Sequence, residues 1–258
     1  MISSCKKEQA AAGIDAQDIS NESMSSFVEK NLVTDEDAAT MRGGAPGLQN
    51  NCNWQELLPE CAIVSVSGET YPKTITIDYG NGCTQGDITK GGVITIVLTD
   101  DMMNAGAVRT VTFQNYQINN TSIEGSRTLT NTGTDELGHP MFHREVNTTI
   151  TRNGNTVSRV AIEAVTWLSG YDTEECGDNV FSVTGSGSIT RPDGITRTRT
   201  IVSPLIIDRI CGYITQGVIE IQGPNGNGSI DFGDGSCDDE ALVTRPNGNT
   251  QVIHLHHP

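Results

Sequence analysis

The feature that most constrains the fold is a long succession of alternating segments, each closed by a turn. From Cys61 onward, stretches such as KTITIDY, GGVITIVLTD and FHREVNTTITR alternate apolar and polar residues, as half-buried strands do. Asn, Gly and Asp cluster between such segments, for example at residues 119–120, 153–155 and 247–249. Short turns of this composition join antiparallel neighbours. We therefore expect an all-β protein, built as a long antiparallel meander of roughly ten to fourteen strands.

The strand pattern leaves the shape of the meander open. One face of FHREVNTTITR carries Phe142, Arg144, Val146, Thr148 and Ile150. Its other face is almost all polar, which predicts a sheet with one solvated face. VSRVAIEAVTWL, residues 157–168, has apolar residues on both faces, so we expect it to be central or covered. The meander can curl into a barrel, a half-barrel or a two-layer sandwich.

The segment before the strands has a different pattern. Apolar residues recur at roughly helical spacing in residues 15–42; they are Ile19, Phe27, Val28 and Leu32. Thr34 followed by Asp37 can cap a second short helix. We expect one or two short helices here, either weakly docked or mobile, followed by the linker GGAPGLQNNCN.

The first residues resemble a bacterial lipobox. Ile2-Ser3-Ser4-Cys5 presents an aliphatic residue, two small residues and the cysteine that such motifs lipidate. We expect the sequence to begin inside a signal peptide and to continue through a polar tether; the alternative is an ordinary free thiol. The predicted organisation is therefore residues 1–53 for the lipobox remnant, the flexible tether and the short helices, and residues 54–258 for a single antiparallel β domain.

The cysteine count points to disulfides. The chain has seven cysteines, and an even number is left once Cys5 is assigned to lipidation. Two segments, residues 61–83 and 211–237, each read as a hairpin with a cysteine at either end. A zinc site would call for close cysteine pairs such as C-x₂-C, which the sequence lacks. The predicted disulfides are Cys61–Cys83, Cys211–Cys237 and, by elimination, Cys52–Cys176.

Two loops with similar sequences raise the question of a metal site. IDFGDGSCDDE, residues 230–240, offers Asp231, Asp234 and Asp238 as hard oxygen ligands for calcium. Their spacing does not fit an EF-hand loop, and IDYGNGCTQGD, residues 77–87, has fewer acids. What both loops share is Gly-x-Gly and a cysteine, as a tight turn beside a disulfide requires. We favour the stapled turn and predict no metal.

Catalytic patterns are weak throughout. His139 and His143 would lie about 13 Å apart on a strand, too far to hold one ion. GSGS at residues 185–188 is not followed by a helix, as a hydrolase nucleophile requires. The acids Glu174 and Glu175 could serve a glycosidase, but they fall in an apparent loop. The other candidates are the terminal histidines and the two tryptophans: His254, His256 and His257 look like part of a solvated strand, Trp54 is a possible sugar contact, and Trp167 is expected in the core. We predict no catalytic residue and no cofactor.

Charge and hydropathy restrict the partners. The formal net charge is −16, and an acidic chain repels nucleic acid. No run approaches the ~20 apolar residues of a membrane helix. The expected contact with a membrane is therefore a lipid on Cys5.

Several segments together resemble a known group. In order they are YPKTITIDYGNGCT, VTFQNYQINNTSIEGSRTLTN, SGYDT, VFSVTGSGS and DFGDGSCDDEALVT. This set resembles Bacteroidota cell-envelope lipoproteins without an established biochemical function, and it extends from about Cys61 to the C-terminus. The resemblance implies an exported, lipid-anchored β protein and implies no activity. Cys52 and Cys176 fall outside the shared pattern.

The expected function follows from these features. We expect an outer-membrane lipoprotein of the cell envelope with a non-enzymatic binding or structural role. One alternative is a carrier or chaperone for a lipid or another hydrophobic ligand, and the least favoured is a glycan-acting enzyme. The expected partners are the membrane, through Cys5, and an envelope glycan, lipid or protein.

Overall fold

The computed structural model describes residues 14–42, 58–173, 177–224 and 226–255. It contains one helix, α1 (Ala16–Arg42), and fourteen strands. The strands are β1 (Ile63–Ser67), β2 (Lys73–Asp78), β3 (Cys83–Gln85), β4 (Ile88–Leu98), β5 (Val108–Ile118), β6 (Thr121–Thr134), β7 (Pro140–Arg152), β8 (Asn155–Ser169), β9 (Val180–Thr190), β10 (Thr196–Asp208), β11 (Ile214–Gly223), β12 (Gly226–Asp234), β13 (Glu240–Thr244) and β14 (Thr250–His254). The all-β prediction is confirmed.

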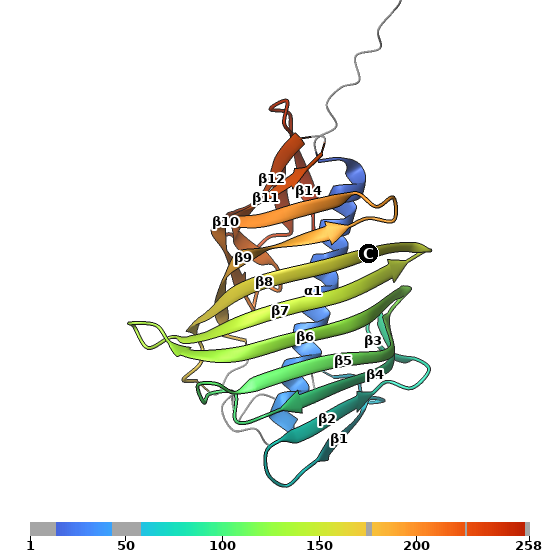
Figure 1. Cartoon of the computed structure of the whole chain (residues 1–258), viewed down its shortest axis with the longest axis vertical. Helices are drawn as coiled ribbons and strands as arrows, with labels where there is room; N and C mark the ends of the chain where they lie inside the picture. Colours follow the sequence, from blue (N-terminus) through green and yellow to red (C-terminus); the bar gives the residue numbers. More distant parts are fainter. Residues whose placement is uncertain (1–13, 43–57, 174–176, 225, 256–258) are drawn as a thin grey trace, which may run out of the picture.

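The strands form one antiparallel sheet whose order follows the chain. Each strand from β4 to β14 pairs with the next, β2 joins β1 to β4, and the short β3 pairs with β4 alone. Two-residue turns join β5 to β6 and β7 to β8 at the predicted Asn-containing positions. The sheet is not closed, which agrees with the half-barrel or sandwich expectation. Figure 1 shows α1 running across the strands on one face of the sheet, with its N-terminal end near β12 and β14 and its C-terminal end toward β1 and β2.

Glycines within strands allow the sheet to curve. Gly125 in β6 has φ +105°, and a Cβ there would lie 2.2 Å from the Asn147 carbonyl oxygen of β7. Gly185 in β9 has φ +130°, and its Cβ would lie 2.3 Å from the Ile162 carbonyl oxygen of β8. Only glycine tolerates both this backbone conformation and such a close approach. The register between β9 and β10 also shifts between Val183 and Gly185.

The N-terminal segment differs most from expectation. In place of one or two short helices, it forms a single helix of 27 residues. Its docking is extensive, because only Ala16, Gln17 and Ser20 are exposed among the helical side chains that the structure describes. The apolar residues account for only part of this burial. The remainder of the covered surface is polar and pairs with the sheet.

The apolar core extends along the whole sheet. Helix α1 contributes Met24, Phe27, Val28 and Leu32 to it. From β2 and β4 come Ile75, Ile77, Ile94 and Ile96, and from β11 and β12 come Ile219, Ile221, Ile230 and Phe232. Trp167 is buried, as predicted. Strand β8 is central in the sheet, which confirms the prediction that it is central or covered, and Val160 and Ile162 on its outer face are exposed.

Two predicted disulfides are confirmed. Cys61 is bonded to Cys83, and Cys211 is bonded to Cys237. The first fastens the segment before β1 to β3, and the second fastens the β10–β11 connection to the loop after β12. The predicted Cys52–Cys176 pair, the lipidation site Cys5 and the boundary between residues 53 and 54 lie outside the described residues.

Candidate functional site

A row of buried charges joins α1 to the concave face of the sheet. The acids lie on α1 or just before it: Asp15, Asp18, Glu22, Glu29, Asp35, Glu36 and Asp37. Their partners lie between β4 and the end of β10: Lys90, Arg109, Arg127, Arg144, Arg159, Arg191, Arg197, Arg199 and Arg209. These are nine of the sixteen lysines and arginines in the chain. We call this set the cationic face.

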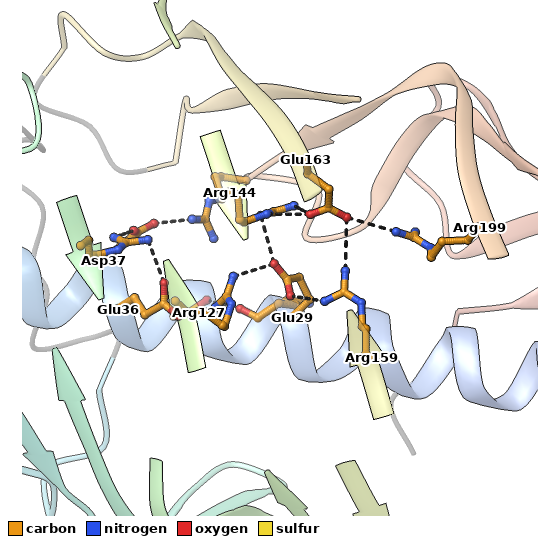
Figure 2. A network of polar contacts seen from close by, with 12 residues as sticks. Glu29, Glu36, Asp37, Arg127, Arg144, Arg159, Glu163 and Arg199 are labelled. Carbon is orange, nitrogen blue, oxygen red and sulfur yellow. Dashed lines mark hydrogen bonds and ion pairs between the residues drawn. The ribbon is translucent and has the colours of Figure 1, made fainter. Parts of the chain in front are cut away.

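Two carboxylates share arginines at the centre of this row. Glu29 of α1 pairs with Arg127 at 2.7 Å, Arg144 at 3.0 Å and Arg159 at 3.1 Å. Arg144 and Arg159 also reach Glu163 of β8, at 2.6 and 3.3 Å. Figure 2 shows Glu29 and Glu163 linked through these shared guanidinium groups, with Arg199 as a further partner of Glu163. The centre of the helix is therefore held by a branched network.

The two ends of the helix are held separately. Near its C-terminus, Asp35 accepts hydrogen bonds from Lys90 Nζ at 2.6 Å and from Tyr116 Oη at 2.8 Å. Near its N-terminus, Asp18 pairs with Arg197 at 3.0 Å and Arg191 at 3.2 Å. Contacts at both ends and at the centre fix which turn of α1 faces which strand.

The network changes the acidity of its carboxyl groups. Burial by itself would raise the pKa of Glu29, but the charges of three arginines outweigh this effect and hold the pKa well below its ordinary value. Glu163 has a lowered pKa for the same reasons. Burial prevails at Glu36, whose pKa is raised although Arg127 and Arg109 pair with it, because Glu29 and Asp37 add negative charge nearby.

Glu29 is expected to make stability depend on pH. A carboxyl group with a lowered folded-state pKa stabilises the protein above its unfolded pKa of about 4.3. That stability is lost as pH falls toward the lower, folded-state pKa. Glutamine at position 29 cannot titrate, so the difference in unfolding free energy between wild type and Glu29→Gln should shrink between pH 6 and pH 3. Urea titrations across that range measure it; a difference that stays constant would contradict the assigned pKa direction.

A cavity of about 250 Å³ lies between α1 and the sheet. One wall is apolar and comes from the strands; its main residues are Phe142, Val165, Trp167, Phe181, Leu205 and Ile207. Trp167 and Phe181 stack there with ring centroids 5.5 Å apart. Charged side chains also line the cavity, among them much of the Glu29–Glu163 network and Lys30. Every carboxylate in the lining already forms an ion pair or accepts a hydrogen bond; these carboxylates belong to Glu22, Glu29, Glu36, Asp37, Glu163 and Asp208.

The predicted metal candidates instead organise their own turns. Asp231 accepts a hydrogen bond from the Gly233 backbone N–H, and Asp234 accepts one from Ser236. Asp238 accepts one from the Glu240 backbone N–H. The structure brings no three His, Cys, Asp or Glu side chains together as ligands within the ranges it describes. The loop therefore has the geometry of a turn closed by the Cys211–Cys237 disulfide.

The other candidate residues are scattered. His139 pairs with Asp135 at 2.8 Å, and His143 lies 3.2 Å from Glu145 on the neighbouring part of β7. His254 pairs with Asp239 at 3.1 Å. None of these three histidines lines the cavity. Trp54, Glu174, Glu175, His256 and His257 lie outside the described residues.

The row of buried charges was not predicted, although the sequence contains two signals for it. Arg144 lies on the otherwise apolar face of β7, where an unpaired charge would be costly. Asp18, Glu22, Glu29 and Glu36 are spaced by four, seven and seven residues, which places them along one side of a helix. Neither signal predicts the network alone: the arginine indicates that a buried charge needs a partner, and the row of acids indicates which residues can supply it.

No helix among the described residues has the length and apolar character needed to span a membrane. Compared with known proteins, the chain matches no family model, no curated protein and no solved structure.

Proposed function

We propose that the protein is an exported, lipid-anchored protein of the cell envelope, attached to the outer membrane through Cys5, with a non-enzymatic binding role. The binding role is carried by one observation: a cavity of about 250 Å³ lies between α1 and the sheet and is lined by both apolar and charged side chains. Cavities with convergent polar groups on an apolar lining are typical ligand sites.

Other observations support the location and the absence of chemistry. Two disulfides favour an oxidising compartment outside the cytoplasm. The lipobox-like residues 2–5 and the resemblance to envelope lipoproteins favour the anchor. The carboxylates lining the cavity are all engaged by partners, so none is poised there as a free general base.

A carrier for a lipid or another hydrophobic ligand is the second candidate, and the apolar wall favours it. The cavity volume lies below the ~300–1,000 Å³ usual for drug-sized ligands. A complete phospholipid would therefore require α1 to move away from the cationic face, whereas a small ligand fits without that movement.

Native mass spectrometry tests the proposed anchor and disulfides. The protein would be expressed with a full signal peptide in a bacterial host and measured before and after reduction. We expect a diacyl- or triacyl-sized increment on Cys5 and a mass change on reduction equal to three disulfides; Cys5→Ser should remove only the lipid increment. An unmodified Cys5 together with reduced cysteines would refute the exported-lipoprotein proposal.

A further inference from the structure

Lys30 differs from every other cation that lines the cavity. The six arginines of the lining, Arg109, Arg127, Arg144, Arg159, Arg199 and Arg209, each pair with a carboxylate. Within the described part of the chain, Lys30 forms no ion pair; its ammonium lies 5.1 Å from the centroid of the Tyr213 ring. The Tyr213 ring offers this partly buried ammonium a cation–π contact. A ring contact does not supply the counter-charge that would offset the lost hydration of the ammonium.

A second cation makes the position of Lys30 more unfavourable. Burial lowers the pKa of Lys30, and the charge of Arg209 lowers it further. The cavity lining also has one cation more than it has carboxylates. The six arginines and Lys30 make seven cations, and the six carboxylates are Glu22, Glu29, Glu36, Asp37, Glu163 and Asp208. One bound monoanion would balance this lining.

Lys30 lines the same cavity as Trp167 and Phe181. Arg209, whose charge acts on Lys30, lies 5.5 Å from the centroid of the Phe181 ring. Phe181 in turn stacks on Trp167 in the apolar wall. A ligand with its charge on Lys30 would therefore place its apolar part against these rings. The buried Ser25 hydroxyl also lines the cavity and has no hydrogen-bond partner among the described residues.

We propose that the cavity binds a small amphipathic carboxylate, with its charged group on Lys30 and its medium-length apolar chain along the Trp167–Phe181 wall. This inference rests on the proposed binding role and gives that role a ligand class. The cavity volume of about 250 Å³ selects a chain of medium length over a complete lipid.

Isothermal titration calorimetry with octanoate and 1-octanol tests this assignment. The two probes share an apolar chain and differ in charge. The full chain would carry Cys5→Ser, so that no anchor lipid competes. We expect octanoate to bind about tenfold more tightly than 1-octanol, the ratio that one modest charge interaction supplies. Absence of octanoate binding, or equal affinity for the two probes, would overturn the proposal.

Two lysine variants separate the site from general electrostatics. Lys30→Gln should weaken octanoate binding about tenfold and leave 1-octanol unchanged, while Lys30→Arg should keep the preference for octanoate. Lys73→Gln is the matched control, because Lys73 also lies over a tyrosine ring, at 4.9 Å, but does not line the cavity. Octanoate affinity that is unchanged in Lys30→Gln would refute the role of Lys30.

A third variant tests the location. Val183 lines the cavity on β9, and Val183→Phe should fill part of the volume and weaken both probes alike. Unchanged affinity for both in a variant with a wild-type thermal midpoint would place the binding elsewhere and refute the site. The lipid anchor of the proposed function is tested separately, because it is judged from the lipid mass on Cys5, whereas the ligand is judged from octanoate binding.

Discussion

Replacing Glu29 with glutamine is expected to lower the free energy of unfolding by about 3–5 kcal/mol at neutral pH. The substitution keeps the shape of the side chain and removes the charge that three arginines share. Arg127 and Arg159 are almost fully buried, so they cannot regain water in compensation. Breaking a buried ion pair from one side leaves uncompensated charge, and that accounts for the size of the effect.

Urea denaturation monitored by circular dichroism measures this loss. Glu145→Gln is the matched control, because Glu145 is exposed on β7 and, within the described ranges, its one ion pair is with His143. Its expected cost is below about 1 kcal/mol, as for other surface ion pairs. A loss under about 1 kcal/mol for Glu29→Gln would mean that Glu36 and Glu163 hold the arginines without it.

Gly125→Ala is expected to cost roughly 4 kcal/mol or more, which belongs to the exceptional range for single substitutions. An alanine with a φ near +105° is strained by about 1–3 kcal/mol. In addition, its Cβ would lie 2.2 Å from the Asn147 carbonyl oxygen, so β6 and β7 must separate locally. The strand pair at the centre of the meander would lose its close packing.

Gly133→Ala separates the backbone strain from the close contact. Gly133 is in the same strand with φ +102°, and a Cβ there meets nothing within 4 Å. This variant therefore carries the same backbone strain without the contact, and we expect it to lose only about 1–3 kcal/mol. Thermal and urea unfolding of both variants compare them directly. Equal losses would show that the close approach of β7 at Gly125 does not contribute.

The parts of the fold that the sequence predicts are local ones. A turn at residues 119–120 or 153–154 depends on the residues in the turn itself and on the strands beside it. The Cys61–Cys83 and Cys211–Cys237 bonds follow in the same way from two other predicted hairpins, residues 61–83 and 211–237. Because the sheet order repeats the chain order, correct hairpins are nearly sufficient to give the whole meander.

The docking of α1 could not be predicted in this way. Its contacts join residues far apart in sequence, from Asp35 with Lys90 to Asp18 with Arg197, separations of 55 and 179 residues. The periodicity of apolar residues also underestimates the length and the burial of this helix, because much of its covered surface is acidic. The cavity escapes prediction for the same reason: Lys30 and Phe181 meet only once the helix lies on the sheet.

The position of α1 ahead of the strands has a consequence for how the molecule assembles. The helix leaves the ribosome before the sheet does, yet its counter-ions are distributed from Lys90 in β4 to Arg209, just after β10. The hairpins of the meander can close one after another, since each needs only its neighbour. Until the sheet is complete, the acids of the helix and the arginines of the strands stay hydrated, and such a polar surface is less prone to aggregate than an apolar one. We therefore expect the helix, although it is synthesised before the strands, to be enclosed after them.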